Sequence, residues 1–287
     1  RIIDRVVERG ECDFVEDLAA PLPMEVICEM MGVPEEDRRR IYELGNRMVG
    51  FDDPELQPDG KPAPMTDGNL ASAEMFLYAA KLAEKARKHP ADDLATALLN
   101  AEVDGHQLSD LEFNSFFLIL AIAGNETTRT VTTNGMYDLL KHPDQYRDLR
   151  EDVTLIPSAV EEILRFNPAV HAFRRTATRD TAVRGVEIKE NDKIVLWYPA
   201  ANRDSEVFEN PDSFDIRRNP NDHLSFGVGE HFCLGSNLAR LELRIIFEGL
   251  MRRLPGIELA AEPRRLRSNF LNGVKEMRVT FSPAKSA

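Results

Sequence analysis

The sequence predicts a single domain that is mainly α-helical and carries small β-sheets. Apolar residues recur at helical spacing through most of the first two thirds of the chain. Short runs of β-branched and aromatic residues, which are typical of strands, are concentrated after residue 172. The chain has 287 residues, of which 43% are hydrophobic, so one large domain with a sizeable core can form over residues 1–287.

Capping and stop residues mark the predicted helices. Ser109 and Glu112 have the spacing of a capping box, and the next proline is Pro143. The sequence therefore predicts one helix of about thirty residues between these signals. Pro34 and Pro90 separate or end other helices. These further helices are predicted over residues 22–33, 35–49, 69–89, 93–101, 156–166 and 234–254.

Strands are predicted later in the chain, over residues 173–178, 183–188 and 194–198. A turn at Asn191 and Asp192 separates the last two of these strands. Residues 202–222 are rich in Asn, Asp, Pro and Arg and show little periodicity, so they are expected to form an ordered meander or a loop. Short strands are expected in the tail.

Composition and charge argue against several classes of protein. A formal net charge of −13 is unfavourable for a nucleic-acid surface. The longest apolar run, residues 116–123, is too short to span a membrane. Cys12, Cys28 and Cys233 are too few and scattered for a disulfide framework, which favours a reducing, cytoplasmic location. The chain begins at Arg1 inside an amphipathic pattern, so an N-terminal portion of the domain is expected to be absent.

The long predicted helix changes character within residues 116–133 (FFLILAIAGNETTRTVTT). Its first half is apolar, and Gly124, Glu126 and Thr127 follow without a proline. Glycine and threonine are weak helix formers, so their place in the most hydrophobic helix requires a reason. One possible reason is local, because a threonine hydroxyl can donate to a carbonyl of its own helix and bend it.

Residues 226–242 (FGVGEHFCLGSNLARLE) place Cys233 at the start of the last long helix, after a glycine-rich loop. A helix N-terminus stabilises a thiolate, and glycines let the backbone approach a flat group closely. Other interpretations are open. A lone cysteine is most often a small buried hydrophobe. A zinc site of His223, His231 and Cys233 has an unusual spacing and lacks a fourth ligand, and the glycine pair resembles a dinucleotide loop only weakly.

Residues 226–235 (FGVGEHFCLG) resemble the haem-binding signature of the cytochrome P450 family. The resemblance covers essentially the whole chain and implies the P450 fold. It implies heme b as cofactor, with the thiolate of Cys233 as the axial ligand of its iron. It also implies that His231 contacts a haem propionate and that Phe226 packs beside the thiolate, with Gly227 and Gly235 shaping the loop.

Residues 123–128 (AGNETT) resemble the oxygen-activation motif of the same family. By this resemblance Ala123 and Gly124 lie against the haem, and Gly124 leaves room for dioxygen. Glu126 and Thr127 are the catalytic pair, because an acid and an alcohol can deliver protons repeatedly.

Three further resemblances concern arginines. Glu162 and Arg165 fit the Glu-x-x-Arg pair of the family, whose two side chains share one helix face. Arg217 is expected to be the third partner of this pair in the meander. Arg175, rather than Arg174, is expected to contact a propionate, because it directly precedes a Thr-Ala pair.

The sequences of residues 123–129, 218–221 and 265–273 resemble those of the bacterial P450s that hydroxylate the terminal methyl group of a sterol side chain. The resemblance implies an apolar, sterol-like substrate and electrons from a separate ferredoxin-type partner. A lid over the channel is expected at residues 52–68. The residues expected to line the pocket are Ile119, Val170, Phe173, Phe270 and Leu271, with Ala123. A P450 for a terpenoid or fatty acyl substrate, or a non-catalytic haem- or lipid-binding protein, are the alternatives.

Overall fold

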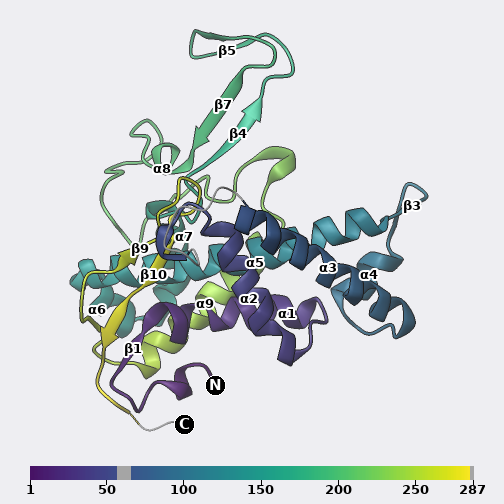
Figure 1. The fold of residues 1–287 in the computed structure, drawn as a ribbon. Helices are drawn as coiled ribbons and strands as arrows, with labels where there is room; N and C mark the ends of the chain where they lie inside the picture. Colours follow the sequence, from purple (N-terminus) through teal and green to yellow (C-terminus); the bar gives the residue numbers. More distant parts are fainter. Residues whose placement is uncertain (57–65, 285–287) are drawn as a thin grey trace.

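The computed structural model describes residues 1–56 and 66–284 and has a body of packed helices with several small sheets (Figure 1). The predicted fold class, mainly α with small sheets, is confirmed. Most of the predicted lid at 52–68 lies outside the described residues. Within the described part of the chain, no helix is both long enough and apolar enough to cross a membrane.

The first helices agree closely with the sequence pattern. They are α1 (Pro21–Met30), α2 (Glu35–Val49), α3 (Thr66–Lys88) and α4 (Leu94–Asn100). A π-helical turn, η2 (Val15–Ala19), precedes α1, and a 3-10 turn, η3 (Pro54–Leu56), follows α2. One face of α1, α2, α3 and α4 packs with the first half of the long helix α5 in a single apolar cluster.

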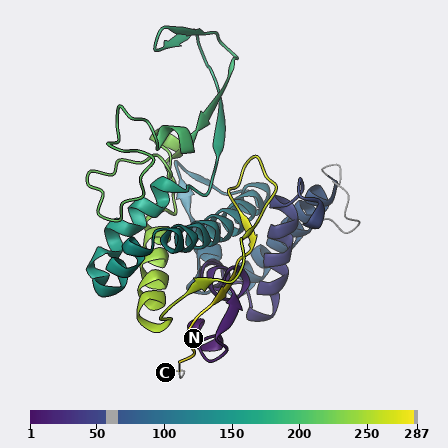
Figure 2. The same ribbon diagram turned by 90° about the vertical axis from the view of Figure 1, so that its left-hand side faces the viewer.

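The long helix α5 (Asp110–Lys141) runs through the middle of the molecule in both views (Figures 1 and 2). The predicted capping box is confirmed: Glu112 N–H donates to Ser109 Oγ, and the Glu112 carboxylate accepts from Ser109 N–H at 2.9 Å. The second half of α5 packs in another cluster against α7 (Ile156–Phe166) and α9 (Ser236–Arg253). A short helix that the sequence pattern did not reveal, α6 (Pro143–Glu151), follows α5.

The sheets are all small and antiparallel. Strand β1 (Glu11–Asp13) pairs with β11 (Arg278–Thr280), which also pairs with β8 (Glu258–Leu259). This sheet brings the two ends of the described chain together. Two-stranded pairs are β2 (Glu102–Val103) with β3 (His106–Gln107), β4 (Ala172–Thr176) with β7 (Lys193–Trp197), β5 (Thr181–Val183) with β6 (Val186–Ile188), and β9 (Arg264–Arg265) with β10 (Val274–Glu276).

The ribbon of β4 and β7 extends away from the helical body and carries the β5–β6 hairpin at its tip (Figures 1 and 2). The single strand predicted at 183–188 is wrong, because Arg184 and Gly185 both have positive φ and turn the chain between β5 and β6. The predicted turn at Asn191 is confirmed, with φ of 71°. After the short helix α8 (Tyr198–Ala201), residues 202–222 form the predicted meander without helix or strand.

Candidate functional site

The Cys233 loop folds back on itself just before α9. Cys233 N–H donates to the Phe226 carbonyl at 2.9 Å, which closes the loop, and the 3-10 turn η5 (Gly229–His231) lies inside it. Gly227 and Gly229 have φ of 72° and 76°, a region that favours glycine. Gly235 caps α9, and a Cβ there would meet nothing within 4 Å. The loop therefore presents Cys233 as an exposed thiol beside open space.

The protonation of Cys233 depends on opposing influences. Although Cys233 is exposed, neighbouring atoms partly shield its sulfur from water and so raise the pKa of Cys233, while the Gly235 N–H and the Arg240 guanidinium lower it. The N–H group at the start of α9 thus favours the thiolate, as predicted. The pKa of Cys233 is nevertheless raised overall, because this shielding has the larger effect. A bound metal ion would displace the thiol proton, because the thiolate is the form that ligates.

Arg240 fixes the loop from behind. Its Nε and Nη2 donate to the Glu161 carboxylate at 2.7 and 2.9 Å, and its guanidinium carbon lies 4.5 Å from the Phe226 ring centroid. His223 Nε2 is 3.1 Å from the same carboxylate. Although burial opposes it, hydrogen bonds from His223 and Arg240 lower the pKa of Glu161 to about 2. Arg240 thus fixes the Phe226 ring within the loop, and the packing of Phe226 against the thiolate stays a prediction.

The zinc hypothesis finds no support in the structure. The His223 side chain is only 2% exposed and is engaged with Glu161. Across residues 1–56 and 66–284, no three His, Cys, Asp or Glu side chains are grouped so that they could hold a metal ion. With His223 engaged elsewhere, Cys233 would be a metal ligand without a described partner. Such a lone thiolate suits a cofactor that supplies the other ligands of its own metal.

Exposed apolar side chains occur on the segments that the sequence assigned to a cofactor and substrate pocket. Ile119 on α5 is 57% exposed, and Phe232, next to the cysteine, is 51% exposed. Phe173 on β4 and Phe270 lie edge to face with ring centroids 5.5 Å apart. Val170 forms an isolated β-bridge with Leu271. Exposed apolar surface of this extent is what binding of a flat apolar group would cover.

Leu271 occupies a different environment from Phe270. It is only 2% exposed and lines the cavity that also borders Glu126. Its predicted contact with substrate stays a prediction, as do those of the other five expected pocket residues.

The predicted propionate contacts have different surroundings. Arg175 is half-buried, donates to the Arg174 carbonyl at 3.2 Å, and its guanidinium carbon lies 5.9 Å from the Phe173 ring centroid. Arg174 is exposed. His231 is exposed in η5. Arg175 and His231 therefore have side chains free to meet an anionic group, and their roles stay predictions.

Thr127 and Gly124 in the polar segment of α5 both have local structural contacts. Thr127 Oγ1 donates to the Ala123 carbonyl at 2.6 Å, which is the local bond that a threonine in a helix can make. Ala123 itself is exposed. A Cβ at Gly124 would lie 3.1 Å from Ile27 on α1, so the glycine permits close packing of these two helices. Its predicted role in leaving room for dioxygen stays a prediction.

Glu126 is buried, with 1% of its surface exposed, and lies in a polar network. Its carboxylate pairs with Arg129 one helical turn away and accepts from the Asn125 amide at 3.1 Å. A Cβ added at Gly45 on α2 would lie 4.0 Å from Glu126 Oε1, so the α2 backbone adjoins the carboxylate. Burial raises the pKa of Glu126, and the Arg129 guanidinium opposes this.

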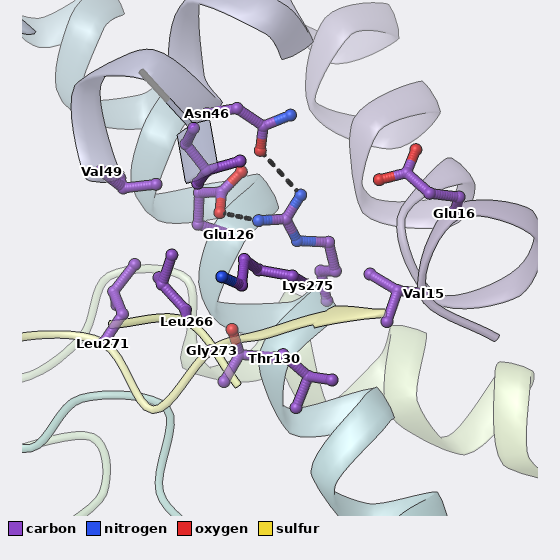
Figure 3. Close-up of a pocket in the computed structure, with 13 residues that line it drawn as sticks. Val15, Glu16, Asn46, Val49, Glu126, Thr130, Leu266, Leu271, Gly273 and Lys275 are labelled. Atoms are coloured by element: carbon purple, nitrogen blue, oxygen red, sulfur yellow. Dashed lines mark hydrogen bonds and ion pairs between the residues drawn. The ribbon is translucent and has the colours of Figure 1, made fainter. Parts of the chain in front are cut away.

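A cavity of about 70 Å³ adjoins Glu126 (Figure 3). Its walls come from η2, α2, α5 and the hairpin of β9 and β10. Figure 3 shows Glu126, Asn46 and Lys275 around this space, with Glu16 on the η2 side. Lys275 Nζ is 2.8 Å from both Asp53 Oδ2 and Glu55 Oε2, so its charge is balanced.

Sequence reasoning missed the partners of Glu126. Arg129, Tyr42, Asn46 and Glu16 were not predicted to belong to the site. One signal was available, because residues 126–129 (ETTR) have the same Glu-x-x-Arg spacing as the pair at 162–165. The contacts from α2 and η2 depend on tertiary packing and leave no mark in the local sequence.

The Glu162–Arg165 pair is confirmed as a structural element. Both side chains are 0% exposed, and two of the Arg165 nitrogens donate to the Glu162 carboxylate at 2.8 Å each. Arg165 also donates to the carbonyls of Asn202, Pro211 and Ser213 in the meander. The pair therefore braces the meander behind the cysteine loop, as predicted.

The predicted third partner, Arg217, is wrong. Arg217 is 49% exposed and pairs with Asp148 on α6. Its neighbour Arg218 instead reaches Glu162, with Nε 3.1 Å from Oε2, and donates to three meander carbonyls. Asp215 N–H also donates to Glu162. The chain direction at residue 215 thus turns the second arginine, not the first, toward the buried acid.

Comparison with known proteins identifies what the chain resembles. The family model described as Cytochrome P450 matches residues 71–256. A steroid C26-monooxygenase of Rhodococcus jostii is 44% identical over 285 residues, which are 99% of this chain and 58% of that protein. A methyl-branched lipid omega-hydroxylase of Mycobacterium tuberculosis is 45% identical over 274 residues, 95% of this chain and 63% of that protein. The chain thus spans about three fifths of the length of these relatives.

A solved structure resembles the whole chain. The Mycobacterium marinum cytochrome P450 CYP268A2, in complex with pseudoionone, has a TM-score of 0.92 and 38% identity. The match covers 98% of this chain and 68% of that one. CYP109E1 of Bacillus megaterium, in complex with corticosterone, has a TM-score of 0.88 and 34% identity over 100% of this chain and 75% of that one.

Proposed function

Because the chain belongs to the cytochrome P450 family, we propose that it forms the haem-thiolate part of a monooxygenase that hydroxylates an unactivated C–H bond of an apolar substrate. The observation that carries this proposal is the exposed thiol of Cys233 in a glycine-rich loop at the start of α9. Its side chain lies close to the exposed Phe232 in sequence, whereas Cys12 and Cys28 are buried, and Arg240 braces the loop through Phe226.

The residues present fit a haem group. When bound, haem with a thiolate ligand supplies activation of dioxygen, since the thiolate pushes electron density toward the iron. Cys233 would hold the iron, and Arg175 and His231 would bind the propionates. The open space at Gly235 leaves the loop backbone accessible to a flat group. Phe232 is one of the apolar side chains that would exclude water from it.

Proton delivery is the task of Glu126 and Thr127 in this proposal. Burial raises the pKa of Glu126 and the Arg129 guanidinium opposes this, so the carboxyl group keeps a proton more tightly than an exposed glutamate does. The Thr127 hydroxyl, bonded to the Ala123 carbonyl in this state, can turn to pass a proton on. These two residues are what distinguishes an enzyme from a haem or lipid binder that kept the fold.

The proposed substrate is the terminal methyl group of a steroid side chain. Relatives named for steroid C26 oxidation are 39–44% identical to this chain, and a relative named for methyl-branched lipids is 45% identical. Both names describe oxidation at a chain end, which supports a pocket that admits an apolar chain end first. Terpenoid and fatty acyl substrates are the alternatives, in keeping with the pseudoionone and acylated carrier protein bound in two structural neighbours.

Electrons would come from a ferredoxin-type partner in the cytoplasm. Three free thiols, Cys12, Cys28 and Cys233, suit a reducing compartment. The partner would approach the Cys233 side of the molecule, where His231 is exposed. Arg240 is less suited to docking because Glu161 already neutralises its charge.

The decisive test is the carbon monoxide difference spectrum of the reduced, haem-loaded chain. We expect the strongly red-shifted Soret band of a thiolate-ligated haem, lost in Cys233→Ala and retained in the matched control Cys28→Ala. Absence of this band in the parent chain, in the presence of bound haem, would overturn the proposal. Retention of the band in Cys233→Ala would exclude Cys233 as the ligand.

Substrate class is tested by spectral titration. Cholest-4-en-3-one is expected to convert the haem from low to high spin, and a fatty acid or pseudoionone is expected to bind more weakly. If only the fatty acid or the terpenoid produces the change, the steroid proposal fails. Turnover with a surrogate ferredoxin and reductase separates an enzyme from a binder, since a binder gives no product despite tight haem.

A further inference from the structure

Arg129 makes contacts on two helices at once. From α5, its Nη2 pairs with the Glu126 carboxylate. Its Nη1 donates to the Tyr42 hydroxyl at 2.8 Å and to Asn46 Oδ1 at 2.9 Å, both on α2. The guanidinium carbon also lies 5.4 Å from the Tyr42 ring centroid. With its side chain only 11% exposed, Arg129 has one well-defined position.

A chain of hydrogen bonds continues from Arg129 to the surface. The Tyr42 hydroxyl donates to Glu16 Oε1 at 2.7 Å, and Glu16 on η2 is exposed. Burial raises the pKa of Tyr42 to about 12, so its hydroxyl stays protonated at neutral pH. Arg129 stays charged as well. Neither group hands on a proton, so together they form a fixed support for Glu126.

Space for water lies directly beside this support. The cavity next to Glu126 measures about 70 Å³, which is room for about two water molecules. Asn46 and Thr130 are polar residues that line it, and Glu16 lines it on the side of η2. Water in this cavity could bring protons to the carboxylate, because Glu126 is one of the residues that line it.

We propose that Arg129, anchored by Tyr42 and Asn46, is a positioning residue that holds Glu126 against this cavity and sets how tightly its carboxyl group keeps a proton. The role of this control in proton delivery rests on the proposed monooxygenase function. The effect of Arg129 on the proton affinity of Glu126 is a property of the protein chain and can be measured without haem.

The charges around Glu126 single out Arg129. Glu16 faces it from η2 and raises the pKa of Glu126, as burial does. Lys275 faces the cavity from β10, but Asp53 and Glu55 balance its charge. Tyr42 is neutral. Removal of the Arg129 charge therefore leaves burial and Glu16 to raise the pKa of Glu126, opposed only by the hydrogen bond from the Asn125 amide among the contacts described above.

The test is an infrared pH titration of the purified chain. The carbonyl stretch of the protonated Glu126 carboxyl group is assigned by its loss in Glu126→Gln. In Arg129→Gln, the midpoint of this band is expected to rise by about 1–3 pH units, a 10- to 1000-fold gain in proton affinity. Arg129→Lys keeps the charge and should restore most of the original midpoint. Arg147→Gln, which removes an exposed arginine paired with Asp144 at the same spacing, is the matched control and should change nothing.

An unchanged midpoint in Arg129→Gln, or equal midpoints in the glutamine and lysine variants, would overturn the proposal. If Arg129→Gln does not fold, Tyr42→Phe takes its place and should shift the midpoint upward by a smaller amount; no shift would overturn the proposal. In the haem-loaded chain, the alkaline limb of product formation should move to higher pH in Arg129→Gln, in step with the infrared midpoint. A shifted midpoint without any thiolate-haem band would refute the proposed function and leave the control of Glu126 by Arg129 intact.

Discussion

Two glutamate–arginine pairs with the same three-residue spacing lie on α7 and α5, and their surroundings differ. Arg165 gives its nitrogens to Glu162 and to three backbone carbonyls, and both side chains are fully buried. Arg129 shares its nitrogens between Glu126 and two side chains of α2, and Glu126 borders a cavity. Spacing alone places each pair on one helix face. The surroundings then decide whether the pair is a fixed structural element or whether its carboxyl group can exchange a proton with water.

The difference follows from the segments that each arginine connects. Arg165 joins α7 to the meander, where the chain has no helix or sheet of its own to satisfy its carbonyls. The meander therefore depends on this side chain for hydrogen bonds. Arg129 joins α5 to α2, two helices that already satisfy their own backbones. Its loss is expected to change the charge of the site more than the fold.

Replacing Arg165 should produce the largest effect on stability. Arg165→Lys keeps the charge but not the planar fork that reaches Glu162 and the meander together. A buried, partly unpaired Glu162 remains, so the free energy of unfolding should fall by about 3–5 kcal/mol. Urea denaturation measures this loss. The exposed pair of Arg147 and Asp144 is the control, and Arg147→Lys should cost less than about 0.5 kcal/mol. A cost below 1 kcal/mol for Arg165→Lys would show that the pair is not locked.

Arg218 and Arg217 test the corrected third partner of Glu162. Arg218→Ala removes a side chain that is 9% exposed and bonded to Glu162, so it should cost about 2–3 kcal/mol. Arg217→Ala removes only the exposed pair with Asp148 and should cost less than about 0.5 kcal/mol. The two variants differ by one position in the chain and have the same chemistry. Equal losses in urea denaturation would contradict the assignment of Arg218.

Glu242 on α9 provides a buried acid without any arginine. It is 4% exposed, its Oε2 has no hydrogen-bond partner among the described residues, and burial raises its pKa to about 7. The folded state therefore keeps a proton that the unfolded state loses above its ordinary pKa of 4.5. Stability contributed by this group is greatest below that pH and falls as the pH rises toward 7.

Glu242→Gln should remove this pH dependence. At about pH 8 the variant should be more stable than the parent chain by about 2 kcal/mol, and the difference should shrink as the pH falls. Urea denaturation at several pH values measures the difference. A stability difference that does not change with pH would show that Glu242 ionises as freely in the folded state as in the unfolded one.

Local patterns predicted most of the helices well. The capping box of Ser109 and Glu112 and the stop at Pro143 correctly bounded α5, because these signals lie within a few residues of the helix ends they mark. Glu162 and Arg165 were predicted as partners because one helical turn joins them. The glycine-rich loop around Cys233 was predicted from the same kind of short-range pattern.

Contacts between distant segments could not be predicted in this way. The choice between Arg217 and Arg218 depends on how the meander turns at Asp215, and both arginines look equal in the sequence. The link from Arg129 to Tyr42 joins residues 87 positions apart. The single strand predicted at 183–188 failed because Arg184 adopts a positive φ, which an arginine rarely does and no propensity anticipates.

Tyr42→Phe should have the smallest effect on stability. It tests the feature by which the Glu126–Arg129 pair differs from the Glu162–Arg165 pair, because Arg129 is held by side chains of α2. The change removes the hydroxyl that accepts from Arg129 and donates to Glu16, but leaves the ring beside the guanidinium and the bond to Asn46. Two hydrogen bonds near the surface predict a cost of about 1 kcal/mol. A double-mutant cycle of Tyr42→Phe with Arg129→Gln measures the coupling between the two side chains by urea denaturation. Coupling of about 1 kcal/mol or more would identify Tyr42 as an anchor of Arg129. Strict additivity would mean that the Tyr42 hydroxyl does not help to hold Arg129, which would leave Asn46 as its hydrogen-bond anchor on α2.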